Sequence, residues 1–129
     1  MNQEERNKIT GKILDASIEV HKNLGPGLLE SVYEVCLCRE LRLRELNYSR
    51  QVFLPVVYKE SELDLDFRID ILVESEIVIE LKAIDGILPV HEAQLLTYLK
   101  LADKRVGLLI NFNVPKLVDG FKRIINGYD

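Results

Sequence analysis

Two neighbouring apolar segments, residues 65–73 and 77–83, constrain the fold of this chain more than any other feature of its sequence. The first alternates apolar with polar residues, as a β-strand with one buried face does, and its apolar positions are Leu65, Phe67, Ile69, Ile71 and Val73. The second is an aliphatic, mostly β-branched run interrupted by Glu80 and Lys82, which predicts a strand deep in a sheet. Because only residues 74–76 separate the two strands, we expect a β-hairpin.

The loop of this hairpin sets which residues face each other. If residues 74–76 form a three-residue loop, Asp70 lies opposite Glu80 and Arg68 lies opposite Lys82. Directly opposed side chains have Cβ atoms ~4.5–5.5 Å apart, and two carboxylates at that distance destabilise a sheet unless a cation lies between them. Mg²⁺ prefers such oxygen ligands. The sequence therefore predicts a metal site at Asp70 and Glu80, with a solvated Glu80–Lys82 surface pair as the alternative.

The rest of the chain predicts helices around this sheet. We expect helices over residues 3–23, 28–46, 90–102 and 116–126. Two further strands are expected over 51–59 and 105–111, with Pro55 marking an edge or a bulge. These elements predict an α/β fold in which a mixed central sheet of about four strands is flanked by helices.

The composition fits one globular domain spanning residues 1–129, since 47% of the chain is hydrophobic and a disordered chain is thereby excluded. No stretch approaches the ~18 apolar residues of a membrane span. The N-terminus lacks the apolar core of a signal peptide, so none is expected. Cys36 and Cys38 point to different faces of a predicted helix, which argues against a disulfide, and we expect Cys36 to pack in the core. A reducing, cytoplasmic setting is expected.

Charge is unevenly distributed along the chain. The net charge of −4 argues against tight, nonspecific coating of nucleic acid. Residues 60–92 carry ten acidic and two basic residues, whereas the flanking segments are slightly basic. Asp70 and Glu80 lie in this acidic block, so a bound divalent cation would cancel two of its charges. A solvated acidic face is the alternative interpretation.

A third carboxylate, Glu30, shares a helical face with Tyr33, Leu37 and Leu41. This spacing predicts that Glu30 faces the core, close to the sheet. The alternative is a first-turn glutamate that is favoured by the helix dipole and is exposed to solvent.

Polar residues also recur on the helix expected over 90–102. Gln94 and Tyr98 are four residues apart and share a helix face, where both can donate hydrogen bonds to phosphate oxygens. His91 lies near the start of the same helix. The alternatives are an ordinary polar face for Gln94 and a capping or exposed role for His91, which we interpret as noncatalytic.

Together these residues resemble a known family. The segment Gly27-Leu-Leu-Glu30-Ser-Val-Tyr33 is similar to the motif that names the GxxExxY proteins, which are small members of the PD-(D/E)xK nuclease superfamily. Asp70 and Glu80-x-Lys82 resemble the acidic signature of that superfamily, with Ile69 in place of its proline. Gln94 and Tyr98 resemble the Gln-x-x-x-Tyr motif of RecB-like nucleases, and residues 107–112 resemble a late strand of the family. The similarity covers residues 7–127.

The resemblance implies a restriction-endonuclease-like α-β-β-β-α-β core, here with extra N- and C-terminal helices. It implies that Asp70, Glu80 and the carbonyl of Leu81 bind Mg²⁺ or Mn²⁺, with Glu30 completing the metal shell or binding a metal-held water. Lys82 would orient and help activate the attacking water, or stabilise charge on the phosphate. Gln94 and Tyr98 would position the scissile phosphate or brace the site. The implied function is a metal-dependent nuclease acting on DNA or, as the alternative substrate, RNA.

Two other functions remain open at this stage. A nuclease fold can serve as a non-catalytic nucleic-acid-binding or assembly module, because fold does not fix function. The basic residues that such a module would use are Arg39, Arg42, Arg44, Arg50, Lys100, Lys104 and Arg105. A homodimer is also open, since a single small domain has little room for separate target recognition. Solubilising surface charge is the alternative interpretation of the basic residues.

Overall fold

The computed structural model describes residues 1–63 and 67–127. Its elements in chain order are α1 (Gln3–Leu24), α2 (Glu30–Leu43), β1 (Tyr48–Phe53), β2 (Val56–Tyr58), β3 (Ser61–Leu63), β4 (Arg68–Val73), β5 (Ile77–Lys82), α3 (Pro89–Ala102), β6 (Val106–Asn111), the 3₁₀ turn η1 (Leu117–Gly120) and β7 (Phe121–Ile125). Among the described residues, no helix is long and apolar enough to cross a membrane.

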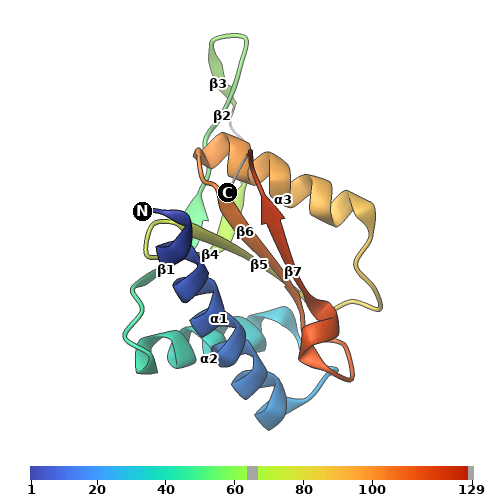
Figure 1. Cartoon of the computed structure of the whole chain (residues 1–129). Coiled ribbons are helices and arrows are strands. Elements are labelled where there is room, and N and C mark those ends of the chain that lie inside the picture. The colour runs from blue at the N-terminus through green and yellow to red at the C-terminus, as the bar shows by residue number, and fades with distance from the viewer. Residues whose placement is uncertain (64–66, 128–129) are drawn as a thin grey trace.

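A five-stranded sheet in the order β1-β4-β5-β6-β7 forms the centre of the molecule, with β5 and β6 parallel and the other pairs antiparallel. Helices α1 and α2 cover one face and α3 covers the other (Figure 1). The parallel β5–β6 pair requires a crossover, which α3 supplies. The expected α/β fold with a mixed, helix-flanked sheet is confirmed, and it is consistent with a restriction-endonuclease-like fold.

The two faces of the sheet build two apolar clusters. The larger lies between the sheet and α1 and α2, and Ile13, Tyr33, Leu37, Ile79 and Ile110 belong to it. The smaller lies under α3 and consists of Ile69, Val78, Leu95, Leu99 and Leu109. Because β5 and β6 are buried on both faces, their sequences are almost continuously apolar.

The β4–β5 hairpin has the predicted register. Val73 pairs with Ile77 and Ile71 pairs with Ile79, so residues 74–76 form the expected three-residue loop. Glu74 and Ser75 take left-handed backbone conformations, with φ values of 52° and 56°. The loop therefore makes its tight reversal without the glycine that usually occupies such positions.

The predicted alternation along β4 is only partly correct. Ile71 and Val73 pack in the larger cluster, but Ile69 packs in the smaller one, on the other face of the sheet. The change of face falls at Asp70, where the β1–β4 pairing omits Asp70 and its neighbour Gln51. Gln51 has a φ of 49°, which a regular strand does not tolerate, so the backbone is distorted at this point. Leu65 and Asp66 lie outside the described residues.

The strand predicted over residues 51–59 is two shorter strands. β1 ends at Phe53, and β2 starts after Pro55, which lacks the N–H that a continuous ladder needs. β2 pairs with β3 in a separate ribbon that projects past α3 (Figure 1). Helix α2 is also shorter than predicted, since it spans Glu30–Leu43 and not residues 28–46.

The closing helix predicted over residues 116–126 is wrong. This segment forms η1 and then β7, which pairs with β6 from Val106↔Ile125 to Ile110↔Phe121 and adds a fifth strand. Leu117, Phe121 and Ile124 happen to recur at steps of four and three, which imitates a helix. Pairing along β6 outweighs this weak local preference, because without β7 the backbone groups on the edge of this fully buried strand that faces away from β5 would have no partner.

Candidate active site

Asp70 and Glu80 are joined across the open end of the β4–β5 ladder. The last ladder pair is Ile71↔Ile79, and beyond it side chains replace backbone partners. The Leu81 amide donates to Asp70 Oδ2 at 2.8 Å, and the Asp70 amide donates to Glu80 Oε1 at 3.3 Å. The two carboxylates therefore lie together where the hairpin strands separate, as the register predicted.

Both carboxyl groups are held in an environment that resists negative charge. Burial, reinforced by the nearby Asp70, raises the pKa of Glu80 to about 8. Burial also raises the pKa of Asp70, and the charges of Glu34 and Glu30 add to the effect, while the bond from the Leu81 amide opposes it. Two buried acids that repel each other form a site that a cation would stabilise, and their oxygen donors suit Mg²⁺ or Mn²⁺.

Lys82 follows Glu80 on the same face of β5. Val78 packs under α3, and Glu80 and Lys82 follow at steps of two, so all three face α3. Lys82 is half-buried, and its positive charge opposes the upward shift in the pKa of Glu80. The predicted pairing of Arg68 with Lys82 is not formed, because the ladder ends before it reaches either residue.

Helix α3 places Tyr98 beside the acidic pair. Tyr98 is 8% exposed, and its pKa is raised by burial and by the charge of Glu80. The Gln94 Nε2 donates to the Tyr98 hydroxyl at 3.3 Å, and the Phe67 ring contacts the Tyr98 ring edge-on at 6.1 Å. Gln94 and Tyr98 thus act as a pair, as their spacing predicted, and Tyr98 is the member that adjoins the carboxylates.

A family model described as the PD-(D/E)XK nuclease superfamily matches residues 7–124. This chain belongs to the PD-(D/E)XK nuclease superfamily. No curated protein and no solved structure matches it. Membership in the superfamily confirms the broader resemblance seen in the sequence, whereas the narrower assignment to the GxxExxY proteins stays a prediction.

Glu30 does not face the core as its helical spacing predicted. It is exposed in the first turn of α2, as the alternative interpretation held, because the helix begins at this residue and the turn faces solvent. It is still close enough for its charge to raise the pKa of Asp70. In this member of the superfamily, Glu30 therefore lies at the outer margin of the acidic site.

Tyr33, the last residue of the same motif, has a structural role. Its hydroxyl donates to the Gly25 carbonyl at 2.6 Å and accepts from the Leu28 amide at 3.1 Å. Its ring stacks on Phe112, with centroids 4.4 Å apart. Tyr33 thus joins the α1–α2 loop to the end of β6 and fixes where α2 begins.

Glu34 is the buried carboxylate of α2, and the sequence reasoning missed it. Glu34 is 7% exposed, and its carboxylate accepts hydrogen bonds from Arg50 and Gln51 on β1. The signal was present, because Glu34 shares a face with Leu37, Cys38 and Leu41 at steps of three and four. A charged residue on an otherwise apolar stripe requires a partner, and Arg50 supplies one.

The end of β6 supports the segment after Lys82. The Phe112 amide donates to the Lys82 carbonyl at 3.0 Å. Asn111 is 1% exposed, and its side chain accepts from the Ile84 amide at 3.1 Å and donates to the Ile84 carbonyl at 3.0 Å. These bonds fix the chain on the C-terminal side of Lys82.

His91 caps a helix, as one of the alternatives held, and the two cysteines differ in burial. His91 Nδ1 accepts from the Leu88 amide at 2.9 Å and so helps to cap α3. Both cysteines are free thiols. Cys38 lies in the core, and Cys36, which we expected there, is only partly buried beside it, because it sits nearer the exposed edge of α2.

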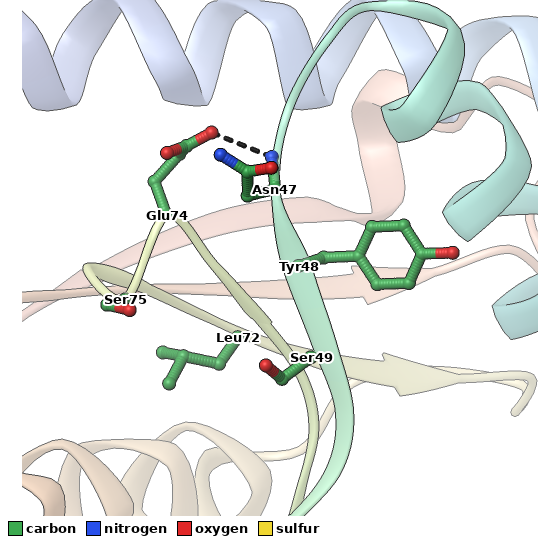
Figure 2. Close-up of a pocket in the computed structure, with 6 residues that line it drawn as sticks. All are labelled: Asn47, Tyr48, Ser49, Leu72, Glu74 and Ser75. Atoms are coloured by element: carbon green, nitrogen blue, oxygen red, sulfur yellow. Dashed lines mark hydrogen bonds between the residues drawn. The ribbon is translucent and has the colours of Figure 1, made fainter.

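A separate pocket of about 190 Å³ lies near the loop end of the β1–β4 pair, and neither Asp70 nor Glu80 lines it (Figure 2). The residues that line it are Asn47, Tyr48, Ser49, Leu72, Glu74 and Ser75. Its one carboxylate, Glu74, accepts from the Asn47 amide at 2.7 Å, as Figure 2 shows. That bond closes the end of the sheet, so we assign the pocket no part in the chemistry.

Proposed function

We propose that this protein is a metal-dependent nuclease that hydrolyses phosphodiester bonds in DNA, with RNA as the alternative substrate. The observation that carries the proposal is the pair of carboxylates, the half-buried Asp70 and the buried Glu80, each of which accepts a backbone amide across the open end of β4 and β5. Lys82 follows Glu80 on the same strand. Membership in a nuclease superfamily agrees with this chemistry.

The donor set fits a divalent ion such as Mg²⁺ or Mn²⁺. In an antiparallel pair, the N–H and C=O of one residue bond to the same neighbouring strand. The Leu81 amide is directed at Asp70 on β4, so the Leu81 carbonyl is expected to turn the same way. We therefore propose Asp70, Glu80 and the Leu81 carbonyl as ligands. A bound ion would lower the pKa of its water and neutralise charge on the phosphate.

The other site residues are proposed to act on water and phosphate. Lys82 follows Glu80 on the same face of β5, where its ammonium group can orient the attacking water. Gln94 and the adjoining Tyr98 hydroxyl are proposed to hold the scissile phosphate. Glu30, exposed at the margin of the site, is proposed to bind a metal-held water and not the ion itself.

The proposal is tested by incubating the purified protein with DNA and Mg²⁺ or Mn²⁺, and with RNA in a parallel reaction. We expect cleavage by the wild type, and loss of at least ~100-fold in rate for Asp70→Asn and Lys82→Ala, because each removes a group from the reacting centre. Glu76→Gln, at the far end of the same hairpin, is the matched control and should cleave normally. Undiminished cleavage by both site variants would contradict the proposal.

A non-catalytic binding module is the second candidate. Among residues 1–63 and 67–127, no group of three or more His, Cys, Asp or Glu side chains is arranged to hold a metal ion, so the proposed metal site has two carboxylates and one backbone carbonyl as its ligands. It predicts salt-dependent DNA binding without cleavage under either metal. The same assay therefore separates the two functions. A homodimer and a cytoplasmic setting, which suits two free cysteines, belong to either proposal.

A further inference from the structure

Strand β1 loses its regular alternation at Arg50 and Gln51. Successive residues of a strand normally point to opposite faces, yet both of these side chains reach Glu34 on α2. The φ of Gln51 is 49°, a left-handed value that residues other than glycine rarely adopt. The β1–β4 pairing skips Gln51 and Asp70 but keeps the same register on both sides of them. This local distortion turns Gln51 toward α2 at the level of Asp70.

The Gln51 side chain links two carboxylates. Its Nε2 donates to Glu34 Oε1 at 2.7 Å. Gln51 also lies across from Asp70, between the pairs Arg50↔Ile71 and Val52↔Ile69, and the interaction of its side chain with the Asp70 carboxyl lowers the pKa of that group, which partly opposes the effect of burial. A side-chain amide carries two N–H donors, so one nitrogen can serve both carboxylates at once.

Glu34 is itself held firmly. Its second oxygen, Oε2, accepts from Arg50 Nε at 3.0 Å and from Arg50 Nη2 at 2.6 Å. Because Glu34 is 7% exposed, turning its carboxylate away would leave a buried charge without these partners. Helix α2 thereby provides a fixed point to which the Gln51 amide is anchored.

We infer that Glu34, acting through Gln51, is a positioning residue that orients the Asp70 carboxylate toward Glu80. This inference rests on the proposed function, since it assigns Glu34 and Gln51 to the outer layer of the same metal site. Groups that hold a metal ligand in place commonly change metal affinity by about 10–100-fold when they are replaced. Gln51 would thus hold the Asp70 carboxylate in the orientation that binds the ion already in the metal-free protein.

The test is the Mn²⁺ dissociation constant of the full chain, measured by calorimetry for the wild type, Glu34→Gln, Gln51→Met and the double variant. Gln51→Met keeps the length of the side chain and the charge of the site but removes both donors. We expect each single variant to weaken Mn²⁺ binding about 10-fold. The double variant should also bind Mn²⁺ only about 10-fold more weakly than the wild type, because both substitutions interrupt the same connection between Glu34 and Asp70. Glu40→Gln, which loses an ion pair elsewhere on α2, is the control and should bind as the wild type does.

A second readout separates positioning from general damage. Saturating Mn²⁺ should restore cleavage by Glu34→Gln, but it should not restore cleavage by Asp70→Asn. If Glu34→Gln does not fold, Gln51→Met still decides the matter, because Gln51 is exposed and its replacement leaves the core intact.

The outcomes distinguish this inference from the function on which it rests. If the wild type binds Mn²⁺ and Asp70→Asn does not, but Gln51→Met and Glu34→Gln bind within about twofold of the wild type, the positioning role is overturned and the metal site stands. An additive double variant, about 100-fold weaker, would also overturn it. If the wild type itself binds no Mn²⁺, the proposed function fails together with the inference.

Discussion

At the scale of single residues, the site is defined by a conflict between burial and charge. Glu80 is 9% exposed and lies beside a second acid, so its pKa rises to about 8. Solvation would favour an ionised Glu80 in the unfolded chain, where its pKa is 4.5. A metal-free folded protein therefore holds a proton that the unfolded chain releases.

This difference predicts a pH-dependent stability. Between pH ~4.5 and ~8 the folded state binds more protons than the unfolded state, so the free energy of unfolding should fall as pH rises through that window. Across this window the free energy of unfolding should fall by on the order of 3–5 kcal/mol. Because Glu80 and Asp70 titrate as a coupled pair, this decrease belongs to the two groups together. Glu80→Gln removes the titration of Glu80, so its stability should be much less sensitive to pH.

The measurement is urea unfolding in the presence of a chelator at several pH values across this window. Glu62→Gln, which changes an exposed carboxylate on β3, is the control and should follow the wild type. Parallel pH curves for the wild type and Glu80→Gln would show that Glu80 is ionised throughout and would contradict the prediction.

At the scale of the elements, the acidic pair depends on contacts that close one end of the sheet. The turn η1 passes directly over the end of β6, and a Cβ built on Gly120 would lie 2.2 Å from the Asn111 carbonyl oxygen. Asn111 in turn holds Ile84, two residues after Lys82. The close approach of η1 to β6 therefore supports the strand that carries the site.

Gly120→Ala should accordingly destabilise the protein by about 2 kcal/mol or more, because either η1 or β6 must move to admit the methyl group. Gly11→Ala is the matched control. A Cβ on Gly11, in the middle of α1, meets nothing within 4 Å, and replacing a mid-helix glycine by alanine should stabilise the protein by about 0.5–1 kcal/mol. Urea unfolding gives both values. Equal stability of Gly120→Ala and the wild type would contradict the close contact.

At the scale of the whole molecule, charge opposes contact with nucleic acid. The chain carries a net charge of −4, and the acidic block of residues 60–92 contains both Asp70 and Glu80. A phosphate that approaches the site therefore meets negative charge unless a cation is present. Under the proposed function, a bound metal ion would allow both the binding of the phosphate and its hydrolysis.

Replacing Asp70 and Glu80 by neutral residues should reproduce part of the effect of a bound cation, because it removes the negative charge that repels phosphate. In the presence of a chelator and at a pH above the Glu80 pKa of about 8, where Glu80 is ionised, the double variant Asp70→Asn/Glu80→Gln should bind a short DNA duplex about fivefold more tightly than the wild type, since unit charges ~4 Å apart in water repel by about 1 kcal/mol. Glu4→Gln/Glu5→Gln removes two charges from the first turn of α1 and is the control. Fluorescence anisotropy at low ionic strength measures both. If the control strengthens binding equally, net charge alone explains the effect.

The sequence by itself determined the parts of this protein that depend on near neighbours. The β4–β5 register follows from a three-residue loop. This register alone, without any contact from the rest of the fold, places Asp70 opposite Glu80. The spacing of Gln94 and Tyr98 likewise places them on one helix face. These features are local, because a tight turn or a single helix fixes which side chains meet.

Only the tertiary structure decided the features that depend on distant partners. Residues 121–125 form β7 because β6 needs a second neighbour, and no local pattern reveals that need. Glu34 is buried, and Glu30 is exposed, because α2 begins at Glu30 and because Arg50 and Gln51 on β1 reach Glu34. Pairing energy and charge compensation act between segments far apart in the chain, so periodicity within one segment cannot report them.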